Sequence, residues 1–324
     1  MLARSAEGLY WLGRHIERTE DLCRLLREQM GALVDRPVRE INFGWRRIYD
    51  TLHRRPPGPA VGVAESDDDY ALADSYTLAD DVTFERANPG SVLNSFSNGR
   101  ENARQMRHCI SGEMWTCLNL AWLRLGTRRI EDIWKAAPES YYAELAREMN
   151  LFAGVVDTTL YRDDGWRFLQ LGRLVERAQF TIALLLAHLE GVGANPEAGD
   201  REWASLLWIC QAFDTYKGRY GVEIRPARVL DLLVEDPRLP RSLCTAIDAA
   251  AATLGALALG PGPCGAARRC AGDLASNVNQ PWPSAPSLPD RAARLRRLDG
   301  DCRALHDLVI AAHVGYDTDG APVR

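Results

Sequence analysis

The chain has 324 residues, of which 46% are hydrophobic and 26% charged, and its formal net charge at pH 7 is −5. These values are typical of a globular protein that buries a substantial core, and the negative charge argues against a nucleic-acid-binding protein. The longest apolar run, residues 249–260, is too short to cross a bilayer, and charged residues interrupt the N-terminal region where a signal peptide needs an apolar core. Composition therefore favours a cytoplasmic protein that binds neither nucleic acid nor membrane.

Apolar residues recur at three- and four-residue spacing along most of the chain, which is the period of an amphipathic helix. Alternating apolar and polar residues, as in a strand, and a glycine-rich phosphate loop are both missing from the sequence. We therefore predict an all-α fold. In chain order the pattern predicts helices at 5–34, 39–53, 90–110, 113–136, 139–160, 165–190, 201–219, 225–234, 239–257 and 289–314, with Pro- and Gly-rich loops at 54–75 and 259–288.

One heptapeptide occurs twice in the chain. Leu-Gly-Arg-x-x-Glu-Arg stands at residues 12–18 and again at 171–177, an offset of 171 − 12 = 159 residues. Ordered matches at about half the chain length predict a duplicated helical bundle with an approximate internal pseudo-twofold. This single domain, residues 1–324, would consist of two repeats at approximately 1–160 and 161–324. Further matching positions, in the same order, are Trp45 with Trp203, Pro89 with Pro240, and Ser91 with Ser242.

The two heptapeptides place charged residues inside otherwise apolar helices. At about 100° per residue, each Arg, Glu and Arg set falls opposite the main apolar stripe of its helix, and apolar side chains border the set on both sides. A helix that is apolar nearly all round is buried, and a buried charge needs a partner. We therefore expect both glutamates to be buried against arginine. The six motif residues are Arg14, Glu17, Arg18, Arg173, Glu176 and Arg177.

Two interpretations of this set remain open. In the structural one, the two sets pair across the pseudo-twofold and lock the halves together. In the functional one, the surplus of arginine over glutamate binds an anion such as a carboxylate or phosphate, which the guanidinium fork recognises. Gly13 and Gly172 indicate a close approach of backbones, because glycine inside a helix costs about 1 kcal/mol relative to alanine.

Other candidate sites are weaker. Arg162 and Asp164 precede the second motif helix; an Asp at 163 or 164 suits an N-cap, and we add Arg162 and Asp164 to the anion-binding or structural set. Eight cysteines lack the spacing of a zinc site and are expected to be free thiols, and none of the six histidines stands in a Glu-x-x-His pattern. We therefore expect no metal and no cofactor.

Several motifs resemble one bacterial family. They are Leu-Tyr-Trp-Leu-Gly-Arg-x-x-Glu-Arg at 9–18, Asn-Pro-x-Ser at 88–91, Arg-Glu-Asn-Ala-Arg at 100–104, Glu-Met-Trp at 113–115, and Arg-Asp-Asp-Gly-Trp-x-Phe at 162–168 leading into the second heptapeptide. Together they resemble the alpha-E family, an all-helical domain named for its Glu-Arg motif. The resemblance covers about residues 1–250 and weakens after Gly260, in the Pro-rich stretch.

The resemblance implies a partner. Alpha-E proteins are typically encoded beside, or fused to, a circularly permuted ATP-grasp amide ligase, often with a transglutaminase-like protein. This implies a helical accessory subunit of a system that makes or modifies a peptide or amide-linked metabolite. One alternative is a stand-alone enzyme that acts on a peptide or aminoacyl intermediate with Glu17 or Glu176 as general acid or base. Another is a purely structural module that forms homo-oligomers.

Overall fold

The computed structural model describes residues 3–57, 68–194, 199–257, 263–280 and 287–314, and these residues confirm the all-α prediction. They form fourteen α-helices and one closing π-helical turn, and no strand occurs in these ranges. None of the helices described is long and apolar enough to span a membrane. The elements are α1 (Ala3–Asp35), α2 (Val38–Thr51), α3 (Asp68–Thr83), α4 (Val92–Gln105), α5 (Gly112–Leu125), α6 (Ile130–Lys135), α7 (Pro138–Thr159), α8 (Asp164–Ala194), α9 (Asp200–Ile209), α10 (Phe213–Tyr220), α11 (Pro226–Glu235), α12 (Leu243–Ala256), α13 (Pro263–Val278), α14 (Leu288–Val309) and η1 (Ile310–Val314).

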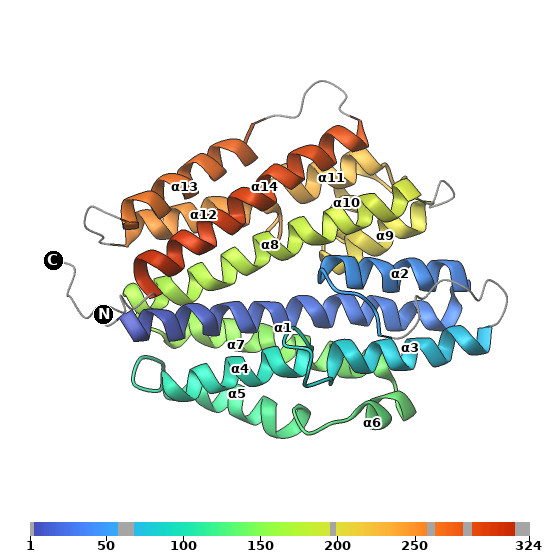
Figure 1. The fold of residues 1–324 in the computed structure, drawn as a ribbon, viewed down its shortest axis with the longest axis horizontal. Coiled ribbons are helices and arrows are strands. Elements are labelled where there is room, and N and C mark those ends of the chain that lie inside the picture. Colours follow the sequence, from blue (N-terminus) through green and yellow to red (C-terminus); the bar gives the residue numbers. More distant parts are fainter. Residues whose placement is uncertain (1–2, 58–67, 195–198, 258–262, 281–286, 315–324) are drawn as a thin grey trace.

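The two motif helices, α1 and α8, pack against each other in the centre of the molecule (Figure 1). On one side α1 contacts α4 and α7, and α5 packs on both of these helices. On the other side α8 contacts α12 and α14, and α13 packs on both. Neighbours therefore recur in the same chain order around α1 and α8, which is what a duplication predicts. Whether one rotation relates the halves remains a prediction, which superposition of residues 5–50 on 164–209 tests.

Local backbone features recur as well. His53 and Gln211, 211 − 53 = 158 residues apart, have φ angles of 52° and 54°, and they are the non-glycine residues with positive φ in the part of the chain that the structure describes. Each lies just past the end of its helix, α2 or α9. Ser91 and Ser242 each cap the following helix by accepting a hydrogen bond from the backbone N–H three residues later. These backbone details support the match of the two halves.

Two predicted loops are partly wrong. Helix α13 lies inside the segment 259–288, and α3 begins at Asp68, inside the segment 54–75. In α13 the side chains that face the core are small or widely spaced, at Ala267, Ala271, Leu274 and Val278. This stripe has helical spacing but little hydrophobicity, so the surrounding Pro and Gly residues outweighed it in the sequence.

Two predicted helices are each divided in the structure. The segment 113–136 forms α5 and α6, because α5 ends at Leu125 with Gly126 as its C-cap, and residues 127–129 separate Gly126 from α6. The segment 201–219 forms α9 and α10, because Gln211 adopts its left-handed backbone conformation between them. A left-handed residue cannot continue an α-helix.

The close approach expected at the motif glycines is confirmed. A Cβ atom on Gly13 would lie 2.1 Å from the carbonyl oxygen of Leu169, and one on Gly172 would lie 2.0 Å from that of Tyr10. The contact is reciprocal, since each glycine of one helix faces the carbonyl three residues before the glycine of the other. Both glycines are therefore required for α1 and α8 to meet at this distance.

We predict that Gly13→Ala and Gly172→Ala each destabilise the protein. The added methyl group must push two backbones apart, and overpacking of this kind costs about 1–3 kcal/mol. Gly154→Ala, within α7, is the matched control because its Cβ would meet nothing within 4 Å. It should stabilise the helix by up to about 1 kcal/mol. Urea unfolding monitored by circular dichroism measures all three; equal effects at the three positions would contradict the close approach.

Candidate functional site

Two arginines of α1 bind one glutamate of α8. Arg14 Nε donates to Glu176 Oε2 at 2.6 Å, and Arg18 Nε donates to Glu176 Oε1 at 2.5 Å. The remaining nitrogens of Arg14 also have partners, in Gln179 Oε1 at 2.6 Å and His306 Nδ1 at 2.8 Å. All three guanidinium nitrogens of Arg14 therefore have partners within the protein.

The reverse arrangement binds the second glutamate. Arg177 and Arg173 of α8 donate from Nε to Glu17 of α1, at 2.6 Å and 3.2 Å. Arg241, in the turn before α12, lies 3.4 Å from the same carboxylate. Each glutamate therefore binds the arginines of the opposite heptapeptide. This reciprocal set has the geometry that the structural interpretation describes, and anion binding by the surplus arginine stays a prediction.

Both glutamates are buried, as expected, with 1% of Glu17 and 3% of Glu176 exposed. Burial alone would raise the pKa of each carboxyl group. The arginine charges and hydrogen bonds outweigh burial, so that the pKa of Glu176 falls to about 2 and that of Glu17 falls further below its usual range. Both are carboxylates at neutral pH, whereas a general acid needs a pKa near the working pH.

The surroundings of Glu17 form a closed ionic cluster. Arg241 also contacts Glu20 and Asp21, and Arg24 contacts the same two carboxylates. The oxygens of Glu17, Glu20 and Asp21 come within 4.8 Å of one another, as metal ligands would. Arg24 and Arg241 already supply the positive charge that a cation would bring. We therefore interpret this cluster as an ion-pair network.

The surroundings of Glu176 are open. A cavity of about 280 Å³ lies between α1, α2, α8, α14 and the turn before α4. Glu176 and Asp299 form part of its wall, and arginines, neutral polar side chains and apolar groups make up the rest. Its size approaches the lower end of small-ligand pockets. The cavity is lined by Arg18, Thr51, Leu52, His53, Arg54, Gly90, Glu176, Gln179, Phe180, Ala183, Asp299 and Arg303, and we call it the Glu176 pocket.

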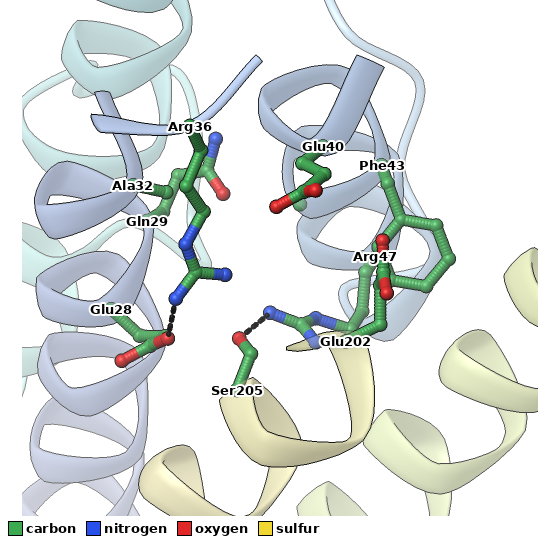
Figure 2. A pocket seen from close by; sticks show the side chains of 10 residues that line it. Glu28, Gln29, Ala32, Arg36, Glu40, Phe43, Arg47, Glu202 and Ser205 are labelled. Carbon is green, nitrogen blue, oxygen red and sulfur yellow. Dashed lines mark hydrogen bonds and ion pairs between the residues drawn. The ribbon is translucent and has the colours of Figure 1, made fainter. Parts of the chain in front are cut away.

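A second, much smaller cavity lies beside α2 (Figure 2). Arg47, buried among its walls, donates to Ser205 Oγ at 3.0 Å, while Arg36 binds Glu28 (Figure 2). Burial lowers the pKa of Arg47 to about 10, against the opposing effect of Glu28. The cavity's volume of about 10 Å³ suits one water molecule, and its wall already holds more carboxylates than arginines. A structural role fits this cavity better than ligand binding.

The candidates at the start of α8 serve the helix end. Asp163 is the capping residue, since its Oδ1 accepts from the backbone N–H of Gly165 at 2.8 Å. Asp164 pairs with Arg167 one turn later at 3.0 Å. The guanidinium of Arg162 lies 5.0 Å from the centre of the Trp166 ring. The structure does not bring Arg162 or Asp164 into the wall of the Glu176 pocket.

His53, Arg54, Gly90, Arg241 and Arg303 were not singled out from the sequence as site residues. One signal was available. The matched turns Pro-x-Ser differ at their middle position, where Gly90 stands in the first half and Arg241 in the second. Arg303 and His53 gave no such signal, because only the packing of α14 and α2 brings them to the pocket.

Residues 1–313 match the Alpha-E family, described as a predicted alpha-helical domain with a conserved ER motif. The chain belongs to the Alpha-E family. Glu-Arg dipeptides, the residue types that this description names, stand at 17–18 and 176–177 at the α1–α8 crossing.

The curated relatives are longer proteins. Uncharacterized proteins of Mycobacterium bovis and of Mycobacterium tuberculosis are 27% identical to this chain over 287 residues, which is 82% of this chain. The match takes up only 30% of the length of these relatives. No solved structure matches the chain at a significant level.

We predict that Glu17→Gln and Glu176→Gln each lower the stability of the protein. Each change leaves buried arginine charge without its counter-ion, and breaking a buried pair in this way costs about 3–5 kcal/mol. Thermal unfolding at neutral pH measures the loss. An unchanged melting temperature in both variants would show that solvent, not the fold, compensates these charges.

The same pairs predict an acid limb of stability. A carboxyl whose pKa is lowered on folding stabilises the native state above its unfolded pKa of about 4.3, and that contribution disappears as the pH falls through the folded pKa. For Glu176 the window runs from about 4.3 to about 2. Glu176→Gln should therefore flatten the dependence of unfolding free energy on pH in this window, compared with Glu190→Gln, which removes an exposed carboxylate. An identical slope in the wild type and Glu176→Gln would contradict the assignment.

Proposed function

We propose that this Alpha-E chain is a helical accessory domain that works with a circularly permuted ATP-grasp amide ligase. The pair would make or modify a peptide or amide-linked metabolite, with ATP chemistry carried out by the ligase. A transglutaminase-like protein is a further partner that the family resemblance suggests. The observation that carries the proposal is the length of the relatives, because the region that matches this chain makes up only 30% of each relative. In those proteins the matched region therefore stands beside other parts of a longer chain.

Two features of the chain support an accessory role over independent catalysis. The sequence has no glycine-rich loop to bind the phosphates of ATP. The motif glutamates, which the enzyme hypothesis assigns as acid or base, are ion-paired and have lowered pKa values. Catalysis by proton transfer would need the opposite shift in at least one of them.

The proposal is tested by binding and by turnover. The tagged chain should retain an ATP-grasp protein from the same genome through size-exclusion chromatography, and should hydrolyse no ATP alone. ADP release by that ligase, supplied with candidate amine and carboxylate substrates, should rise when the chain is added. The matched control is Gly13→Ala chain at the same concentration, because it disturbs the α1–α8 crossing. If no complex forms and turnover is unchanged, the accessory role is wrong.

A further inference from the structure

The Glu176 pocket and the Glu17 cluster occupy equivalent places in the two halves. The offset of 159 that aligns the heptapeptides also aligns the helix positions one and two turns further on. The offset of 158 pairs His53 with Gln211, and the offset of 151 pairs the middle residues of the two Pro-x-Ser turns. The equivalent residues are Glu17 with Glu176, Glu20 with Gln179, Asp21 with Phe180, Arg24 with Ala183, Gln211 with His53, and Arg241 with Gly90.

In the Glu17 cluster, arginine side chains fill the space beside the glutamate. Arg241 reaches Glu17, Glu20 and Asp21, and its Nε also donates to Gln211 at 3.1 Å. Arg24 occupies the space beside it and donates to the backbone oxygen of Ile209. The cluster is thus closed by two long side chains that belong to the protein.

At the Glu176 pocket, the equivalent residues leave the space beside the glutamate empty of side chains. Gly90 has no side chain where Arg241 reaches inward, and Ala183 ends at its Cβ where Arg24 extends. Two of the three acids that bind Arg241, Glu20 and Asp21, correspond to the neutral residues Gln179 and Phe180. The 280 Å³ of the Glu176 pocket lies at the place that corresponds to the guanidinium groups of Arg24 and Arg241 in the Glu17 cluster. The pocket is therefore a feature in which the halves differ in sequence, rather than a gap common to both.

The backbone does not require glycine at position 90. Gly90 is not among the residues with positive φ, and a Cβ added there would meet Asn88 Oδ1 at 3.5 Å, an ordinary contact. Almost any residue would therefore fit the turn. Glycine at this position has one evident consequence, which is that the pocket stays open.

The charges of the pocket favour an anion. Glu176 binds two arginines, so its neighbourhood carries one positive charge in excess. The Nε of Arg18 donates to Glu176, and the Arg18 side chain, which forms part of the pocket wall, is 34% exposed. Arg54 has its buried Nε without a hydrogen-bond partner, and its nearest carboxylate, Asp81, is 3.9 Å away. Arginine forks of this kind recognise planar carboxylates.

The remaining walls favour a ligand with an apolar part. Leu52, Phe180 and Ala183 contribute hydrocarbon surface. At the rim, Arg303 lies 3.2 Å from His53 Nε2 and is also paired with Asp299 at 2.9 Å. One excess positive charge matches a monoanion better than a phosphate dianion.

We propose that the Glu176 pocket binds a small organic carboxylate, either a free acid or the C-terminus of a short peptide. The carboxylate binds Arg18 and Arg54, and the apolar part of the ligand contacts Leu52 and Phe180. The equivalent place in the other half cannot bind such a ligand, because Arg241 and Arg24 occupy it. This site is a property of the chain alone and goes beyond the proposed partnership with a ligase.

Isothermal titration calorimetry on the full chain without any partner tests the site. The probes are isovalerate, N-acetyl-Ala-Leu, its C-terminal amide and inorganic phosphate. Binding of isovalerate indicates a free acid as ligand, and tighter binding of the dipeptide than of isovalerate indicates a peptide C-terminus. The amide should bind at least about tenfold more weakly than the dipeptide acid. No binding of either carboxylate at about 10 mM, or binding of phosphate alone, would overturn the proposal.

Two matched pairs of variants locate the binding. Gly90→Leu should fill the pocket and weaken carboxylate binding by at least about tenfold, whereas Gly90→Ala should bind as the wild type does. Arg54→Gln and Arg303→Gln should also weaken binding. Arg296→Gln, which removes an arginine of α14 that is as exposed as Arg303 but pairs with Glu190, should have no effect.

Circular dichroism and the melting temperature verify that each variant is folded. A folded Gly90→Leu with undiminished carboxylate binding would place any bound acid elsewhere. Equal losses of carboxylate affinity in Arg54→Gln and Arg296→Gln would show that net charge alone, and not the pocket, causes the loss. Either result refutes carboxylate binding in the Glu176 pocket, even if the partnership with a ligase holds. Failure of the pull-down would refute the partnership alone, because the calorimetry uses no partner.

Discussion

The crossing of α1 and α8 is the contact on which the rest of the fold depends. Two glycines let the backbones touch, and two glutamates, each bound by arginines of the other helix, hold the crossing in register. Neither feature works without the other. Without glycine the helices could not approach, and without reciprocal pairing the buried charges would be left uncompensated. In the part of the chain that the structure describes, α4, α5 and α7 gather on the α1 side of this pair, and α12, α13 and α14 gather on the α8 side.

The Glu17 cluster and the Glu176 pocket lie at matched positions beside the central charges, and their residues differ. The Glu17 cluster carries additional acids and arginines that close on one another. The Glu176 pocket has none of those side chains and has basic groups from the end of α2 and from α14, so that a cavity remains beside Glu176. A lock is needed at both places for stability, whereas a binding function needs only one of them open. Divergence between halves is thus a physical clue to function that neither half shows by itself.

Much of this could be predicted from the sequence. The all-helical fold, the burial and pairing of Glu17 and Glu176, and the close contact at Gly13 and Gly172 follow from residue types and helical spacing. The helix α13 did not, because its core face is built mainly from small residues between Pro- and Gly-rich stretches. Its place as the counterpart of α5 would have indicated it. Contacts to Arg303 depend on how α14 packs, which local patterns do not encode.

The most direct test of the account is a double-mutant cycle across the crossing. Glu17→Gln, Arg177→Met and the double variant are compared by urea unfolding, with Glu101→Gln and Arg104→Met as the control for an exposed pair on one helix. Reciprocal locking predicts a coupling free energy of at least about 2 kcal/mol between Glu17 and Arg177. The control pair should show far weaker coupling, because solvent screens it. Coupling across the crossing no larger than in the control would contradict the central role of these ion pairs.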